Sequence, residues 1–316
     1  MENRILGLHH ITAIAGQAQR NYDFYTGTLG LRLVKKTVNY DDPGTYHFYF
    51  GDTTGSPGTI LTFFPWEDIQ KGRPGNGMAT EIGYAVPAGS LDFWKERLKS
   101  YQLQSEQQRF GESYIRLEDP DGLILNLVVP ADADERKPWT GNGVQADAAI
   151  RGFHNVTLNV RRLDPTASVL TDIFGYTLKA TEDNRHRFVT DAISTANIVD
   201  IVEDPHGPQG INAGGTNHHV AFRVKDDNIL MEFREKVIKK GLHITEKIDR
   251  NYFYSLYFRE PGGILFEIAS DNPGFLIDES LEKLGSQLML PPQYEVHRDR
   301  IEAWLPEIPS DVHSNV

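Results

Sequence analysis

The chain has 316 residues, which is enough for two domains with their own cores, and 39% of them are hydrophobic, as in ordinary globular proteins. Its 32 basic and 44 acidic residues give a net charge of −12, which argues against nucleic acid and anionic membrane surfaces as partners. Cysteine is absent, so disulfides, thiolate metal sites and cysteine nucleophiles are excluded.

Four segments of the chain open alike, and this internal repeat is the main organising signal. The four opening segments, which alternate in character like strands, are residues 8–14, 80–86, 153–160 and 217–224. Stretches with helical spacing follow at 21–30, 90–101, 165–175 and 227–241. Strand-like runs separated by Gly, Pro and Asp close each unit, which therefore has the order β-α-β-β-β.

The repeats predict an α+β fold in which four βαβββ units form two open, mixed β-barrel modules followed by a helical tail. We expect an N-terminal domain over residues 1–135, a C-terminal domain over 150–275 and a tail over 276–316, with two units in each domain. The charged segment 131–149, which contains Gly and Pro, is the expected linker. Residues 280–284 and 298–305 are the expected helices of the tail, which we expect to wrap the body or a partner subunit.

Side chains alternate between the two faces of a strand, and this alternation indicates which residues of the opening strands face a common cleft. One set of alternate positions is apolar and suits packing under a helix, whereas the other is small or polar. The polar set contains His10 and His219. Because neighbours in a strand point in opposite directions, we expect His9 and His218 to begin on the other face.

The last strand of unit four adds a carboxylate to the same cleft. Glu267 lies in the run ILFEIA at 264–269, where burial without a partner would cost several kcal/mol. A divalent cation would be a suitable partner, and the two imidazoles would bind it as well. The equivalent positions in the other units are Phe63, Asn126 and either Asp200 or Ile201.

Two histidines and one carboxylate are therefore assembled by His10, His219 and Glu267, which come from units one and four. If they bind one ion, unit one must lie beside unit four around a single cleft. Units two and three would then form a second barrel that holds no metal.

These units resemble the vicinal oxygen chelate superfamily of glyoxalases, bleomycin resistance proteins and dioxygenases. The whole chain is similar to the bacterial hydroquinone-type ring-cleaving dioxygenases of that superfamily. The segments that carry the similarity are LHHIT at 8–12, LRLVKKT at 31–37, NRHR at 184–187, HH at 218–219, Arg250 with YF at 252–253, Tyr257, PGGILFE at 261–267, PGF at 273–275 and LPPQ at 290–293.

The resemblance implies an Fe(II)-dependent enzyme that opens hydroquinone- or catechol-type rings and inserts both atoms of O₂. The implied iron ligands are His10, His219 and Glu267. The residues implied to surround the metal and the substrate are Thr12, His218, Arg250 and Tyr257. His9 is a weaker candidate for this group, and the role of His186 stays open.

Two other functions stay open on the sequence. A glyoxalase-type, metal-dependent lyase or isomerase would use further carboxylates, and Glu81 is the residue that would suit this alternative. A non-catalytic resistance protein that sequesters aromatic compounds would not need the ligand triad. The other histidines are interpreted as structural: His47, His206, His243, His297 and His313.

The expected partners are a small aromatic substrate, O₂ and further copies of the chain in a homo-oligomer. No apolar stretch approaches the roughly 18–20 residues of a membrane span. The first residues contain no charged and apolar signal region, so we expect a cytoplasmic protein.

Overall fold

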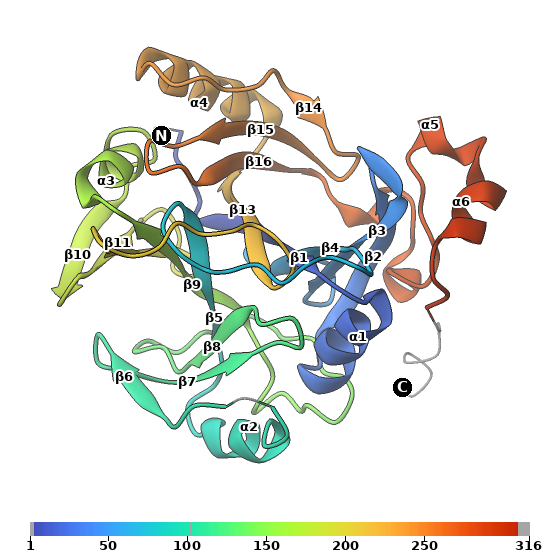
Figure 1. The fold of residues 1–316 in the computed structure, drawn as a ribbon, viewed down its shortest axis with the longest axis horizontal. Helices are drawn as coiled ribbons and strands as arrows, with labels where there is room; N and C mark the ends of the chain where they lie inside the picture. The colour runs from blue at the N-terminus through green and yellow to red at the C-terminus, as the bar shows by residue number, and fades with distance from the viewer. Residues whose placement is uncertain (1–2, 102, 309–316) are drawn as a thin grey trace.

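The computed structural model describes residues 3–101 and 103–308 and contains two curled, mixed sheets of eight strands each (Figure 1). The α+β class and the tandem modules expected from the repeats are confirmed. In hydrogen-bonded order, the first sheet contains β14 (Ile248–Asp249), β15 (Phe253–Arg259), β16 (Leu265–Pro273), β13 (Thr216–Val224), β1 (Leu8–Ala15), β4 (Ile60–Pro65), β3 (Asp42–Gly51) and β2 (Arg32–Asn39). The second sheet contains β10 (Thr177–Glu182), β11 (Arg185–Val189), β12 (Ile198–Glu203), β9 (Gly152–Val160), β5 (Met78–Ala85), β8 (Ile124–Val128), β7 (Glu112–Glu118) and β6 (Gln107–Arg109).

Each sheet combines one unit from each half of the chain. Units one and four share the first sheet through the antiparallel pair β1–β13, and units two and three share the second through β5–β9. The prediction that unit one lies beside unit four is therefore confirmed. The boundaries at 1–135, 150–275 and 276–316 stay a prediction, since neither sheet belongs to a single half.

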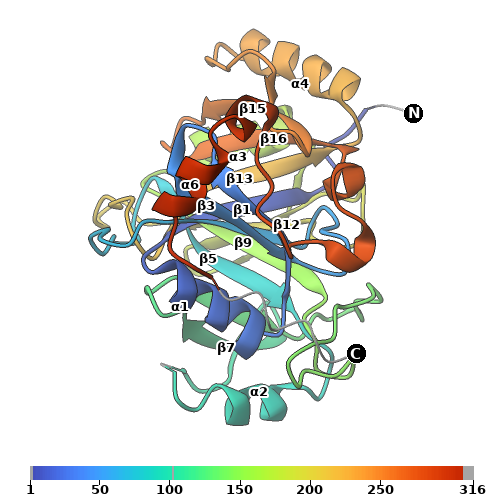
Figure 2. The ribbon, with the colours of Figure 1, turned by 90° about the vertical axis from the view of Figure 1, so that its right-hand side faces the viewer.

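The helices lie on the outside of the sheets, with α4 at one end of the molecule and α2 at the other (Figure 2). The helical elements are α1 (Ala18–Tyr22), a π-helical continuation η1 (Asp23–Thr28), α2 (Leu91–Arg97), α3 (Leu163–Asp172), α4 (Asp227–Lys239), the 3₁₀ turns η2 (Phe275–Ile277) and η3 (Leu281–Lys283), α5 (Pro292–Glu295) and α6 (Arg298–Trp304). The first and third helices begin earlier than predicted, and the helix predicted at 280–284 is a 3₁₀ turn over Leu281–Lys283. No helix among the described residues is long and apolar enough to cross a membrane.

Helix α4 illustrates how the sequence pattern produces the packing. The Asp226 carboxylate caps the helix by accepting from the backbone N–H groups of the first turn. Leu230, Phe233 and Val237 recur at helical spacing and are buried towards β15 and β16. The apolar positions of the opening strands and of β16 are likewise buried, as their alternation predicts.

The opening strands are not regular, because each contains one extra residue at the same place. On β1, Leu8 pairs with Phe222 and His10 pairs with Ala221, so His9 is the extra residue. On β13, His219 pairs with Thr12 and Asn217 pairs with Ala13, so His218 is the extra residue. In the second sheet the corresponding residues are Thr80 and His154. Bulges of this kind bend a strand and redirect its side chains.

The parallel pairing of first and last strands fixes which residues are equivalent in the four units. Ala221 pairs with Glu267 in unit four, and Thr12 pairs with Thr62 in unit one. The position of Glu267 is therefore taken by Thr62 in unit one, and the prediction of Phe63 is wrong by one residue. In units two and three the equivalent residues are Asn126 and Asp200.

The tail packs along unit one. Lys35 on β2 is fully buried and places Nζ 2.6 Å from Asp278 Oδ1 and 2.5 Å from Glu279 Oε2. The Tyr294 hydroxyl donates to the backbone carbonyl of Tyr40, 2.7 Å away. The prediction that the tail wraps the body is confirmed for its described residues.

Candidate metal centre

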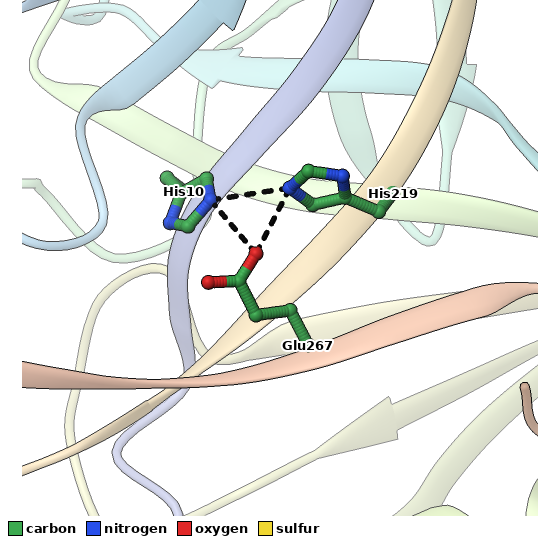
Figure 3. A group of neighbouring side chains, drawn as sticks. All are labelled: His10, His219 and Glu267. Atoms are coloured by element: carbon green, nitrogen blue, oxygen red, sulfur yellow. Dashed lines mark hydrogen bonds and ion pairs between the residues drawn. The ribbon is translucent and has the colours of Figure 1, made fainter. Parts of the chain in front are cut away.

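The side chains of His10, His219 and Glu267 converge from β1, β13 and β16 of the first sheet (Figure 3). His219 Nε2 lies 2.9 Å and His10 Nε2 lies 3.2 Å from Glu267 Oε2, and the two Nε2 atoms are 3.3 Å apart. All three residues are buried. Among the described residues, this is the one cluster of three or more such donors with metal-ligand spacing.

The geometry fits a divalent metal. Bonds of about 2.1 Å at right angles place neighbouring ligand atoms about 3.0 Å apart, close to the three separations observed. Glu267 Oε2 is fully buried and faces the two imidazoles, which are neutral when they bind a metal, so a divalent cation between the three groups would supply the positive charge that the carboxylate then lacks. Burial alone would raise the pKa of the Glu267 carboxyl, but His10 and His219 outweigh it and hold the pKa well below its usual range.

Each tandem histidine pair holds its second ring in place through the first. His9 Nδ1 lies 2.9 Å from His10 Nδ1, and His218 Nδ1 lies 2.8 Å from His219 Nδ1. His9 and His218 are the bulge residues, and each ring contacts the ring of the histidine that follows it. His218 lines the same cavity as His10 and His219, although the alternation predicts that it begins on the other face, whereas His9 lies among a different set of residues. The contacts leave both Nε2 atoms of His10 and His219 free to face the centre, which is the usual arrangement of metal-binding histidines.

The serine of β15 orients the carboxylate, and sequence reasoning missed it. The Ser255 hydroxyl donates to Glu267 Oε1, which leaves Oε2 directed at the imidazoles. Ser255 is two residues before Tyr257, which pairs with Glu267, so both lie on the face of the carboxylate. The signal in the sequence is a single serine within the otherwise apolar and aromatic run FYSLYF at 253–258.

A cavity of about 380 Å³ opens beside the centre and is lined mostly by aromatic and polar side chains. It includes four residues that the resemblance implied: Thr12, His218, Arg250 and Tyr257. Arg250 Nε donates to the Tyr257 hydroxyl over 3.2 Å, and its guanidinium lies over the Tyr257 ring. Burial, followed by the charge of Glu267, raises the pKa of Tyr257. Burial, followed by His219, lowers the pKa of His218 to about 3.

His47, which the sequence analysis interprets as structural, also lines the cavity. Burial lowers the pKa of His47 well below its usual range, and His10 and His219 lower it further. The alternation of β3 carried the signal. Phe48 and Phe50 are buried in the core, whereas His47 and Tyr49 lie on the opposite face of the strand.

The remaining candidates lie away from the centre. Glu81, in the second sheet, accepts from Arg109 over 3.0 Å and from Arg116 over 3.3 Å. Asp200 binds Arg187 over 2.8 Å. In this sheet guanidinium groups pair with the carboxylates. His186 contacts the Thr181 hydroxyl at an exposed edge.

Comparisons with known proteins agree with this picture. The sequence profile of the Glyoxalase/Bleomycin resistance protein/Dioxygenase superfamily matches residues 7–127 and 152–268. A Bacillus subtilis protein named "Putative ring-cleaving dioxygenase MhqO" is 45% identical over 306 residues, covering 96% of this chain and 97% of that protein. The chlorohydroquinone/hydroquinone 1,2-dioxygenase of Sphingobium indicum is 36% identical over 311 residues, covering 95% and 96%. A crystal structure from Bacillus subtilis, 44% identical, superposes with a TM-score of 0.93 over 98% of this chain and 99% of that one.

Proposed function

Because the chain belongs to the glyoxalase/bleomycin resistance protein/dioxygenase superfamily, we propose that it is an Fe(II)-dependent ring-cleaving dioxygenase of hydroquinone- or catechol-type aromatics. The observation that carries the proposal is the cluster of His10, His219 and Glu267 at the base of an aromatic cavity. Two histidines and one carboxylate on one side of a metal, with the other side open, are typical of non-haem Fe(II) oxygenases.

Bound Fe(II) would supply adjacent open positions at which an ionised ring hydroxyl and O₂ meet, and it would pass electron density from the ring to O₂. The protein's share begins with the cavity, whose 380 Å³ suits a single substituted ring. Arg250 at the cavity wall would attract a ring whose hydroxyl has lost its proton. Its contact with Tyr257 keeps the guanidinium in place.

His218 would serve as a hydrogen-bond donor beside the centre. When His219 binds a metal through Nε2, its Nδ1–H donates to His218 Nδ1, which is 2.8 Å away. The proton of the His218 ring is then on Nε2, which makes no hydrogen bond among the described residues and belongs to a residue of the cavity wall. His218 can thus donate to an oxygen atom bound in the cavity.

The glyoxalase-type alternative fits less well. It calls for further carboxylates, yet the position equivalent to Glu267 in unit one is Thr62. Glu81, the residue that would have suited this alternative, lies in the other sheet and is paired with arginines.

The test is to load the protein with Fe(II) without oxygen, add a substituted hydroquinone or catechol, and then admit ¹⁸O₂. We expect a ring-opened acid that contains two labelled oxygen atoms. A Glu267→Gln variant prepared in the same way is the control and should consume no O₂. Release of benzoquinone without ring opening would overturn the proposal.

A further inference from the structure

A chain of hydrogen-bonded groups connects β3 with the candidate metal centre through the wall of the cavity. The Tyr49 hydroxyl lies 2.9 Å from His47 Nδ1, and His47 Nε2 lies 2.9 Å from Thr62 Oγ1. Thr62 Oγ1 is in turn 2.9 Å from Thr12 Oγ1. The rings of Tyr49 and Phe64 pack against the His47 ring at tilted angles, with centroids 4.1 Å and 4.3 Å away.

The direction in which these groups donate their hydrogen bonds follows from Tyr49, the buried end of the series. Tyr49 is 1% exposed, and its hydroxyl has no acceptor among the described residues other than His47 Nδ1. A buried phenolic proton without an acceptor is costly, so Tyr49 donates to Nδ1. A neutral imidazole carries one proton, which must then be on Nε2 and be donated to Thr62.

The same reasoning continues to the cavity. Thr62 accepts from His47, and its own proton is therefore donated to Thr12 Oγ1. Thr12 makes no other side-chain hydrogen bond among the described residues and lines the cavity. Its hydroxyl proton is thus left for whatever occupies the cavity, two residues along β1 from His10 and on the same face.

The register of the sheet shows which position of the repeat Thr62 occupies. Thr62 stands in unit one where Glu267 stands in unit four. Where the repeat could have supplied a second carboxylate, it supplies a hydroxyl that passes on the hydrogen-bond direction set by Tyr49. A carboxylate at this position could only accept, and Thr12 would then donate to it instead of donating to the cavity.

We propose that Tyr49 and His47 are positioning residues that make Thr12 a fixed hydrogen-bond donor to an oxygen of the bound substrate. The site thereby selects aromatic rings that present an ionised or carbonyl-like oxygen beside the metal, and it disfavours rings that present a donor there. This inference rests on the proposed function for its ligand, whereas the direction of the chain is a property of the protein alone.

The first test determines which ring nitrogen of His47 carries the proton. Nitrogen-15 NMR of metal-free protein labelled in histidine should show His47 with a bare Nδ1 and a protonated Nε2, and His47→Gln identifies its signals by difference. In Tyr49→Phe the Nδ1 partner is lost, and the tautomer preference should weaken. A protonated Nδ1 in the wild type would overturn the proposal, whatever the enzyme's activity.

The second test measures binding of 4-nitrophenolate to Fe(II)-loaded protein without oxygen. Thr12→Val removes a hydrogen bond to a charged oxygen and should weaken binding about 10- to 100-fold, while Thr12→Ser should bind like the wild type. His47→Leu should weaken binding about 10-fold, since Thr12 keeps a hydroxyl that must reorient. His47→Gln, which can still donate to Thr62, should restore most of the affinity.

A double variant isolates the coupling. In a Thr12→Val background, His47→Leu should have no further effect on 4-nitrophenolate binding, because it acts through Thr12. If Tyr49→Phe and His47→Leu bind 4-nitrophenolate as tightly as the wild type while the enzyme still opens the ring, this inference is refuted and the proposed function stands. Absence of ring opening in a protein that shows the expected His47 tautomer would refute the proposed function and support the direction of the chain.

Discussion

At the scale of single residues, the second histidine of each tandem pair is a candidate metal ligand and the first contacts it, and measurements of metal binding can test these two roles. We expect His10→Ala and His219→Ala to lose most of their iron, because two protein ligands hold a metal poorly. His9→Ala and His218→Ala should keep iron at saturating supply, since these rings orient a ligand and do not bind the metal, and activity should fall about 10- to 100-fold. Iron quantification and turnover of the four variants check this. Loss of iron from His9→Ala and His218→Ala, but not from His10→Ala and His219→Ala, would require a different ligand set.

Ser255 provides a second test at this scale. Ser255→Ala removes the hydrogen bond that orients Glu267, and we expect metal affinity to fall about 10- to 100-fold. Ser270→Ala is the matched control, because Ser270 is an equally buried serine of the same sheet whose hydroxyl bonds the backbone near Asn272. Metal titration of both variants is the measurement. Equal affinities in the two variants would show that Ser255 plays no part in metal binding.

Much of the centre could be predicted from the sequence, because strand alternation depends on the sequence alone. It identified the face shared by His10, His219 and Glu267. It did not identify Thr62 or the contacts within the histidine pairs, because strand register and bulges depend on how a strand pairs with its neighbour. The same rule applies to His47 in the alternating run at 45–50, whereas a single histidine in a strand, taken alone, favours a structural interpretation.

At the scale of elements, the buried ammonium group of Lys35 on strand β2 pairs with two carboxylates of the tail. Lys35→Met would leave Asp278 and Glu279 without their partner, and we expect the free energy of unfolding to fall by about 3–5 kcal/mol. Lys36→Met is the control on the same strand, since Lys36 makes no ion pair among the described residues. Urea unfolding monitored by circular dichroism measures both. A loss below about 1 kcal/mol for Lys35→Met would mean that other contacts of the tail hold it in place.

The ion pairs of the second sheet predict a dependence of stability on pH. Burial favours the neutral form of Glu112, but His154 and Arg187 outweigh it and lower its pKa to about 2. A carboxyl whose pKa is lowered on folding stabilises the protein above its unfolded pKa of about 4.3. That contribution is lost as the pH falls towards 2.

The stability difference between wild type and Glu112→Gln should therefore be largest above about pH 4.5 and should narrow as the pH falls below it. Urea unfolding between pH 3 and pH 7 measures the difference. Glu182→Gln, on the exposed strand β10, should show no such trend. A difference for Glu112→Gln that stays constant over this range would contradict the assignment.

At the scale of the whole molecule, each sheet combines units from both halves of the chain, which predicts that each half needs the other in order to fold. Residues 1–140 and 141–316, produced separately, each lack the partner strand of their opening strands, β13 for β1 and β9 for β5. We expect neither fragment alone to bind metal or to unfold cooperatively, and we expect mixing to restore both properties. Circular dichroism and metal binding of the separate and mixed fragments are the measurements. A fragment 1–140 that folds cooperatively by itself would show that the halves are independent domains.

The pairing of β1 with β13 also sets when the centre can come into existence during synthesis. His10 and His219 are 209 positions apart, and Glu267 follows later still. A ribosome adds roughly 5–20 residues per second, so roughly 10–40 s separate the two histidines on the nascent chain. Throughout that interval His10 is a single imidazole on a strand that lacks one neighbour. Unfinished chains therefore cannot assemble the three candidate ligands, and the reaction that we propose for this centre requires a chain that has been synthesised at least as far as Glu267.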